Sequence, residues 1–360
     1  MIFGGAGFIG SNLAHSLLQS DAKVRIYDNL SRPGVKHNLA WLEKAAGRSR
    51  RLDVVVGDVR DAQKVQRVLA DATEVYHFAA QVAVTTSLTD PRLDFETNLC
   101  GTFNILEGAR LSGNRPFLLF TSTNKVYGDM GDRPVVKHDG RYAYESDVNG
   151  ISEQQQLDFH SPYGCSKGAA DQYVRDYARV YGIPAVVFRM SCIAGKRQFG
   201  NEDQGWVAHF LYSALTRKPL VIYGDGLQVR DVLYADDLVR AIEAARANSP
   251  ITAGEIYNIG GGRNHTTSLL ELIDMIEDLT GRKLQYSFDA PRPGDQLIYV
   301  SDTRKFTRHT DWAPTTDVAS TLEHIYDFWK ENRLAIEDLH QASMPLVEPT
   351  AAPVELGRLA

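Results

Sequence analysis

The sequence lacks the residues that mark secreted, membrane-spanning or zinc-binding proteins. Its 360 residues include only three cysteines, Cys100, Cys165 and Cys192, and neither they nor the ten histidines show the spacing of a zinc site. This pattern predicts no metal and a reducing, cytoplasmic location. The longest apolar stretches, such as residues 75–84, are far shorter than the roughly 18 residues of a membrane span, so we expect no contact with a membrane.

An excess of positive charge is also missing. The 39 Lys and Arg residues are outnumbered by 45 Asp and Glu, which gives a formal net charge of −6, and no basic run stands out. Proteins that bind nucleic acid normally carry a basic patch, so we expect no nucleic-acid partner. The chain instead is 43% hydrophobic, which is enough for the core of one large domain or two smaller ones.

Strands and helices are predicted to alternate through the first half of the chain. The expected strands are residues 1–3, 23–28, 52–58, 74–80, 115–123 and 183–190, and the expected helices are 11–20, 34–46, 61–70, 92–112 and 162–181. Strands that are apolar on both faces predict an α/β fold with a doubly wound parallel sheet. The first strand is short, which indicates that the sequence starts inside the strand or that upstream residues are missing.

A glycine-rich turn follows the first strand and opens a helix. The segment GGAGFIG places Gly4, Gly7 and Gly10 three residues apart. This spacing allows a tight turn, a close approach of the backbone to a pyrophosphate and close packing of helix against strand. The pattern predicts a Rossmann-type dinucleotide site; a structural tight turn is the alternative.

An acidic residue at the end of the second strand indicates which dinucleotide binds. Asp28 lies 18 residues beyond Gly10, where a carboxylate can accept hydrogen bonds from both hydroxyls of the adenosine ribose and would repel a 2′-phosphate. This favours NAD over NADP, although Arg32 nearby leaves NADP open. Asp58 ends the third strand, where it either accepts from the adenine amine or caps the next helix.

A tyrosine and a lysine lie four residues apart in the segment SPYGCSK. On a helix these positions share a face, so the ammonium of Lys167 would lie beside the hydroxyl of Tyr163. A nearby cation favours the phenolate, which can remove a hydroxyl proton while hydride leaves the same carbon. The pattern YxxxK is weak by itself. A hydroxyl at the end of the fifth strand would complete the set, and Thr123 is preferred over Ser122.

In combination, GGAGFIG, Asp28, TSTNKVYG and YGCSK resemble the extended short-chain dehydrogenase/reductase family, and more narrowly its nucleotide-sugar epimerases and dehydratases, over residues 1–330. The resemblance implies catalysis by Thr123, Tyr163 and Lys167 and a homodimer formed through a four-helix interface. The expected NAD-binding residues are Gly4, Gly7, Phe8, Ile9, Gly10, Asp28, Asn29, Asp58, Val59, Ala79, Ala80, Tyr163 and Lys167. The expected substrate-binding residues are Thr85, Ser87, Asn124, Lys125, Gln204, Arg230 and Arg292.

The two residues after Thr123 separate the possible reactions. Dehydratases of this family use an Asp-Glu pair there as acid and base, whereas this chain has Asn124 and Lys125, which suit hydrogen bonds to sugar hydroxyls. We therefore expect a nucleotide-sugar epimerase that oxidises its substrate transiently with NAD and returns hydride to the opposite face. The alternatives are a 4-epimerase of a UDP-sugar and a catalytically silent NAD-binding regulatory protein.

The change in pattern along the chain predicts two domains. Residues 1–189 are expected to form the NAD-binding Rossmann domain, to which part of residues 229–260 returns. Residues 190–330 are expected to form a smaller, mixed α/β domain that binds the nucleotide sugar. Residues 331–360 are expected to be a tail.

Overall fold

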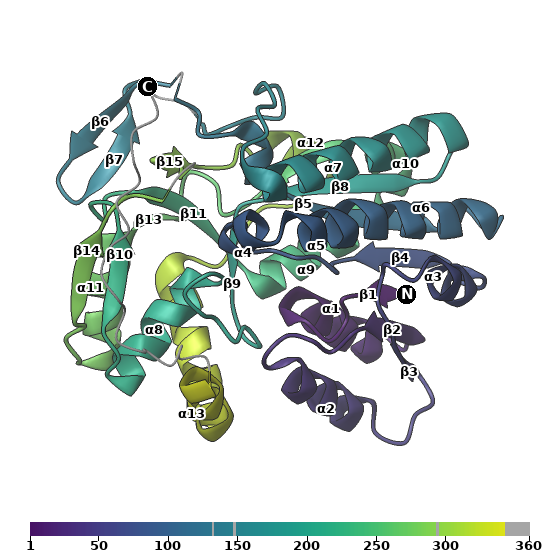
Figure 1. The fold of residues 1–360 in the computed structure, drawn as a ribbon, viewed down its shortest axis with the longest axis horizontal. Helices are drawn as coiled ribbons and strands as arrows, with labels where there is room; N and C mark the ends of the chain where they lie inside the picture. The colour runs from purple at the N-terminus through teal and green to yellow at the C-terminus, as the bar shows by residue number, and fades with distance from the viewer. Residues whose placement is uncertain (132, 147–148, 293–294, 343–360) are drawn as a thin grey trace, which may run out of the picture.

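A seven-stranded parallel sheet lies at the centre of the larger part of the molecule (Figure 1). The computed structural model describes residues 1–131, 133–146, 149–292 and 295–342. The strand order is β12-β8-β5-β4-β1-β2-β3, and every pairing in it is parallel. The strands are β1 (Ile2–Phe3), β2 (Val24–Asp28), β3 (Leu52–Val56), β4 (Glu74–His77), β5 (Phe117–Thr123), β8 (Ala185–Met190) and β12 (Ile256–Ile259). This confirms the predicted fold class.

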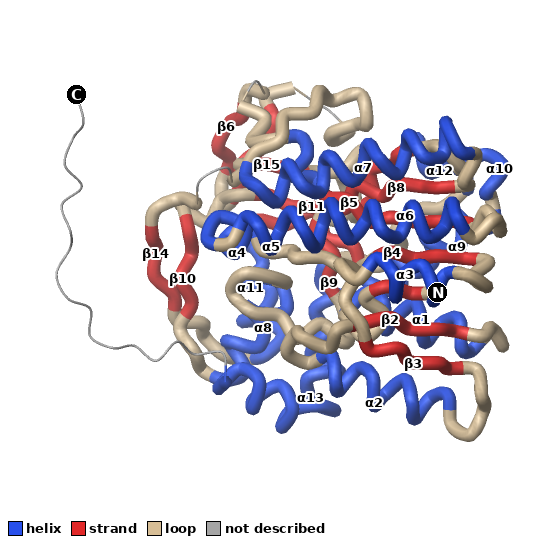
Figure 2. Tube along the Cα trace, turned by 45° about the vertical axis from the view of Figure 1, so that its right-hand side comes forward, coloured by secondary structure: helices blue, strands red, loops and turns tan. Residues whose placement is uncertain are grey.

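Helices cover both faces of the sheet (Figure 2). On one face lie α1 (Phe8–Gln19), α2 (Val35–Ala46) and α9 (Ala235–Ala247), and on the other α3 (Ala62–Leu69), α6 (Gly101–Leu111) and α7 (Ser161–Tyr181). Each face has its own apolar core, one including Leu13, Leu42 and Leu238 and the other Leu69, Leu106 and Val174. Short elements complete this part: α4 (Val84–Thr89), α5 (Pro91–Phe95), the π-turn η1 (Glu96–Cys100), η2 (Asn124–Tyr127), α10 (Ser249–Thr252) and α12 (Arg304–Thr310).

The limits of α1 and α7, the two helices that contribute most to the site, are set by the residues at their ends. Helix α1 begins at Phe8, three residues earlier than expected, because Gly7 is its N-cap and the glycine turn leads straight into it. Helix α7 has a proline in its first turn and ends at Gly182, whose φ of +65° is the left-handed conformation that glycine adopts easily. The prediction for α7 is therefore confirmed to within one residue.

The smaller part of the molecule contains short mixed sheets and three helices. Its strands are β6 (Val135–His138), β7 (Arg141–Tyr144), β9 (Cys192–Ala194), β10 (Leu220–Tyr223), β11 (Val229–Tyr234), β13 (Thr266–Ser268), β14 (Tyr286–Asp289) and β15 (Ile298–Tyr299). Helices α8 (Trp206–Thr216), α11 (Leu269–Thr280) and α13 (Val318–Ala342) pack around a core that includes Leu211, Leu272 and Leu322. The hairpin of β6 and β7 lies between β5 and α7 in the sequence, where no strand was expected.

The expected domain limits stay a prediction, although the elements bear on them. Strand β12 and helix α9 belong to the larger part, whereas β11 pairs with β9, β13 and β15 in the smaller part. Helix α13 continues to Ala342, beyond the expected start of the tail at residue 331. Residues 343–360 lie outside the described residues. Within the described part of the chain, no helix is both long and apolar enough to cross a membrane.

Candidate active site

A cavity of about 600 Å³ opens at the carboxyl ends of the central strands. Its wall combines the glycine turn after β1 with residues at or just after the ends of β2, β3 and β4, with Thr121 and Ser122 near the end of strand β5, and with part of α7. Eleven of the thirteen predicted NAD-binding positions fall in four groups, in the glycine turn and at the ends of β2, β3 and β4, and the other two, Tyr163 and Lys167, come from α7. The full set is Gly4, Gly7, Phe8, Ile9, Gly10, Asp28, Asn29, Asp58, Val59, Ala79, Ala80, Tyr163 and Lys167. All of them therefore line a single cavity.

The glycine turn has no room for side chains. Gly4 has a φ of +73°, and a Cβ on it would lie 2.7 Å from the backbone nitrogen of Ala79 at the end of β4. A Cβ on Gly10 would collide with the carbonyl oxygen of Gly4. No side chain caps the N-terminus of α1, so its first N–H groups are available to an anion. These features fit the pyrophosphate of a dinucleotide.

Asp28 is tied to this turn by its own carboxylate. One oxygen accepts from the backbone N–H of Ala6 at 3.0 Å and the other from that of Leu30 at 2.8 Å. Burial raises the pKa of Asp28, and these backbone hydrogen bonds oppose the rise. Each oxygen keeps a lone pair for a ribose hydroxyl, so the geometry fits the role predicted for Asp28.

Asp58 lies on the same side of the cavity and does not cap a helix. Its carboxylate forms a two-pronged pair with Arg60 at 2.9 and 2.8 Å and also accepts from Asn29 at 3.4 Å. The hydrogen bonds from Arg60 are the main reason that the pKa of Asp58 falls to about 2. Asp61 caps α3 instead, by accepting from the backbone N–H of Lys64. The capping alternative for Asp58 is therefore wrong.

Tyr163 faces the same cavity but is in a different electrostatic setting from the one expected. Burial raises the pKa of its phenol to about 12, while a hydrogen bond with Thr123 and the charge of Arg32 act in the opposite direction. The expectation that Lys167 would favour the phenolate is wrong for this structure. The spacing of four residues places both side chains on one helix face, but it carries no information on burial.

The ammonium of Lys167 is bonded to the backbone of β5 and not to the hydroxyl of Tyr163. Its ammonium donates to the carbonyl oxygen of Thr121 at 2.6 Å and lies 4.2 Å from the ring centroid of Phe120. The side chain is 3% exposed, and this burial lowers its pKa to about 7. Thr123 at the end of β5 is also buried, and its hydroxyl interacts with Tyr163, Asn124 and the backbone of Lys125. The structure therefore brings the three predicted catalytic residues together.

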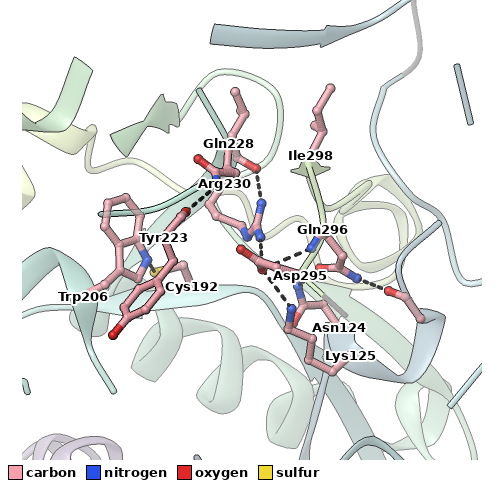
Figure 3. A network of polar contacts seen from close by, with 12 residues as sticks. Asn124, Lys125, Cys192, Trp206, Tyr223, Gln228, Arg230, Asp295, Gln296 and Ile298 are labelled. Atoms are coloured by element: carbon pink, nitrogen blue, oxygen red, sulfur yellow. Dashed lines mark hydrogen bonds and ion pairs between the residues drawn. The ribbon is translucent and has the colours of Figure 1, made fainter. Parts of the chain in front are cut away.

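The predicted substrate residues Asn124, Lys125 and Arg230 do not line this cavity and belong instead to a polar network around Asp295 and Gln296 (Figure 3). Lys125 and Arg230 both point at Asp295, with distances of 3.3 and 2.8 Å from nitrogen to carboxylate oxygen. Burial by itself would raise the pKa of Asp295, but the two cations hold it below its ordinary value. Asn124 donates to the side chain of Gln296 at 3.1 Å. Sequence reasoning missed Asp295 and Gln296, although both lie within four residues of Arg292.

Of the remaining predicted substrate residues, Gln204 lines the cavity and Arg292 does not. Gln204 accepts a hydrogen bond from Arg32, which joins the loop after β2 to the loop before α8. Arg292 lies 4.0 Å from the ring centroid of Tyr223 and donates to Glu202 at 3.2 Å.

Helix α4 presents a different hydroxyl from those expected. Thr85 donates to Asp203 at 2.9 Å, and the buried Ser87 donates to the carbonyl of Val84 within its own helix. Thr86, between them, lines the cavity instead. Sequence reasoning also missed Cys192 and Gln81 in the wall, for which no local pattern gives a signal.

Together, the fold and the cavity define a Rossmann-type enzyme of the short-chain dehydrogenase/reductase class, with the Tyr163–Lys167 pair beside the glycine turn. A family model described as GDP-mannose 4,6 dehydratase matches residues 1–325, so the chain belongs to this family of NAD-dependent epimerases and dehydratases.

Individual relatives match over nearly their whole length. The CDP-paratose 2-epimerase of Salmonella typhi is 41% identical over 335 residues, which cover 91% of this chain and 98% of the relative. The UDP-glucuronic acid 4-epimerase of Bacillus cereus, in complex with UDP-glucuronic acid and NAD, superposes with a TM-score of 0.79 at 29% identity, covering 92% and 98% of the two chains. The dTDP-glucose 4,6-dehydratase DesIV of Streptomyces venezuelae, with NAD bound, gives 0.80 at 30% identity, covering 94% and 98%.

Proposed function

We propose that this NAD-dependent nucleotide-sugar epimerase acts on carbon 2 of a CDP-linked sugar, as the name of the Salmonella typhi relative indicates for that protein. The observation that supports epimerisation over dehydration is the pair that follows Thr123. Asn124 and Lys125 cannot serve as a carboxylic acid and a carboxylate, and they are hydrogen-bonded to Gln296 and Asp295. Asp295, the carboxylate nearest to them in this network, is held ionised by two cations, so it is a poor proton donor.

The catalytic roles follow from the positions of three side chains. Tyr163, at the cavity wall and within reach of Thr123, would remove the proton from the reacting hydroxyl and later return it. Bound NAD⁺ supplies the hydride acceptor, and its reduced form is the hydride donor. Thr123 would hold the reacting oxygen, and Lys167, buried beneath the cavity wall, would provide positive charge. The positive charge of the cofactor near the phenol would counter the effect of burial on Tyr163.

Inversion requires that the sugar turn over while the nucleotide stays fixed. The two arginines of the predicted substrate set, Arg230 and Arg292, suit a fixed diphosphate because guanidinium groups bind phosphate with two parallel hydrogen bonds. Arg230 already has its side chain ordered by Asp295 and by the carbonyl of Val229. In our proposal these residues anchor the nucleotide, and the sugar lies between them and Tyr163.

The experiment that tests the function is a panel of CDP-, UDP- and GDP-sugars incubated with the purified protein. Product stereochemistry is read by NMR, and deuterium from solvent or substrate reports where the hydrogen travels. Inversion at carbon 2 of a CDP-sugar is the expected result. Inversion at carbon 4 of a UDP-sugar would establish the alternative that the Bacillus cereus neighbour suggests. Loss of water from the sugar would contradict epimerisation.

We also propose a homodimer formed through α6 and α7, which lie side by side in both views (Figures 1 and 2). Five large apolar side chains on these helices are between 42% and 61% exposed: Phe103, Leu111, Tyr173, Val180 and Tyr181. An apolar surface of this kind on one face is typical of an interface. Sedimentation of wild type and Val180→Glu tests it, and a wild-type monomer would refute it.

The three unpaired cysteines support a cytoplasmic location.

A further inference from the structure

A buried carboxylate, Asp94, contacts helix α7 and has only neutral hydrogen-bond partners. Asp94 in α5 is fully buried, and its two oxygens accept from the hydroxyl of Ser166 and from the amide of Asn98, the latter at 3.0 Å. Asn98 in turn accepts from the backbone N–H of Gln81 in the cavity wall at 2.9 Å. Among the ion pairs of the described residues, none includes Asp94. A buried negative charge without a cation in contact is costly, so its retention needs an explanation.

The neighbour of Ser166 supplies the missing positive charge. Lys167 is almost as deeply buried as Asp94, and its ammonium contacts one carbonyl oxygen and one aromatic ring. Neither contact carries a negative charge. An ammonium in this setting keeps its proton only if a carboxylate lies within electrostatic range.

The other charged groups around Lys167 are already matched. Asp171, on the next turn of α7, is held by Arg189 through two hydrogen bonds of 2.7 and 3.1 Å, with both side chains buried. His77 in β4 is neutral, because burial holds its pKa well below the ordinary value. Tyr163 and Arg32 lie on the cavity side. Asp94 is therefore the carboxylate near Lys167 whose charge no other cation offsets.

We infer that Asp94 is the counter-ion of Lys167 and a positioning residue for the reaction proposed above. It acts through Lys167 and does not touch the substrate. The pKa of Lys167, lowered to about 7 by burial, is raised most by Asp94 among charged groups, and the pKa of Asp94, raised by burial, is lowered by Lys167. Each group therefore favours the charged form of the other.

The direction of the effect follows from the charges. Asp94→Asn removes the negative charge, so Lys167 loses its proton at a lower pH than in wild type. The alkaline limb of kcat/KM is expected to move by one pH unit or more toward acid. The direct effect on Tyr163 concerns the other limb: Asp94 raises the pKa of that phenol, so its removal lowers this pKa and moves the acid limb, which the phenolate base sets, toward acid as well.

A matched control separates this effect from a general loss of activity. Asp176 lies exposed on α7, and Asp176→Asn removes the same charge from the same helix. We expect the alkaline limb of this variant to coincide with that of wild type, measured with the nucleotide sugar that the panel identifies. A folded Asp94→Asn enzyme with a wild-type alkaline limb would overturn the proposal, even if its kcat were reduced.

A second measurement needs neither activity nor a folded Asp94→Asn variant. In protein labelled with ¹³C at aspartate carboxyl groups, the Asp94 resonance is titrated by NMR in wild type and in Lys167→Met. Loss of the ammonium is expected to raise the pKa of Asp94 by one unit or more, and an unchanged value would reject the pairing. Since this readout involves no sugar, it remains decisive if the proposed reaction proves wrong.

Discussion

The two ends of the candidate active site differ in composition, since one is formed by backbone and the other by charged side chains. At the NAD end, the walls are backbone: the turn at Gly4 and Gly10 approaches the chain so closely that no Cβ fits. At the end proposed for the nucleotide, long charged side chains are found instead, of which Lys125 and Arg230 share one carboxylate (Figure 3). A backbone wall binds one shape of ligand, whereas paired side chains can exchange partners. The comparison teaches that cofactor retention and substrate turnover place opposite demands on neighbouring parts of the candidate active site.

The largest effect is expected where the two ends meet. Tyr163→Phe removes the hydroxyl that exchanges the proton and should lower kcat by about 10²- to 10⁴-fold, the usual contribution of general acid–base catalysis. NAD should stay bound, because the turn and Asp28 are unchanged. Turnover by NMR and bound NAD by absorbance after denaturation check the two halves. Near-normal turnover would remove the phenol from the mechanism.

A methyl group at the turn should damage the NAD end alone. Gly10→Ala places a Cβ against the carbonyl oxygen of Gly4, so the turn has to shift away from its position under α1. We expect loss of co-purifying NAD and a destabilisation of about 1–3 kcal/mol, as for overpacking. Calorimetry and the NAD content of purified protein measure both.

A glycine-to-alanine substitution outside the NAD turn is the matched control. Gly47→Ala lies at the end of α2, where a Cβ would meet open space, although its φ of +59° adds strain. This variant should lose some stability and keep its NAD. If Gly10→Ala also kept full NAD, the backbone wall would not be what retains the cofactor.

The sequence predicts the backbone end well and the side-chain end in part. Gly4, Asp28 and Tyr163 belong to motifs in which neighbouring residues, a strand and a helix start fix the geometry, so local pattern is enough to place them in one cavity. Asp295 pairs with Lys125 across 170 residues, and no periodicity connects the two. Such pairs depend on how the smaller part of the molecule packs against the sheet.

Charge states were the least predictable property. The i, i+4 spacing placed Lys167 on the face of Tyr163, but the ammonium bonds to Thr121 instead, and burial moves both pKa values in the unfavourable direction. Burial is a sum over distant elements, and Asp94, which offsets it, comes from α5. A sequence motif therefore identifies the reacting groups, whereas the tertiary structure sets their protonation.

The nucleotide end can be divided by two variants that each remove one partner of Asp295. Arg230→Met should raise KM by about 10- to 100-fold with little change in kcat, the size of one charge-assisted hydrogen bond of about 1.5–3 kcal/mol. Lys125→Met should lower kcat more than it raises KM, if this lysine contacts the sugar. Steady-state kinetics on the identified substrate measure both. Equal effects of the two variants on KM would place both cations on the diphosphate.

The smallest effect on ligand binding is expected at Asp58, the side chain that is predicted to contact the adenine of NAD. Asp58→Asn should weaken NAD binding by about 2- to 10-fold through one lost hydrogen bond of about 0.5–1.5 kcal/mol, as measured by calorimetry on NAD-free protein. Because Arg60 holds the pKa of Asp58 near 2, below the usual value of about 3.9, this carboxylate is ionised at all pH values above about 4. Its contribution should therefore be constant between pH 5 and 8 and disappear only as the pH falls toward 2.

Asp61→Asn is the control, since Asp61 caps α3 without lining the cavity. This variant should leave both stability and NAD affinity nearly unchanged, because asparagine caps a helix as well as aspartate does. An unchanged affinity in Asp58→Asn would assign Asp58 to holding Arg60 and Asn29 in place. The adenine would then be held, like the pyrophosphate, by the shape of the backbone, and the contrast between the two ends of the site would be sharper still.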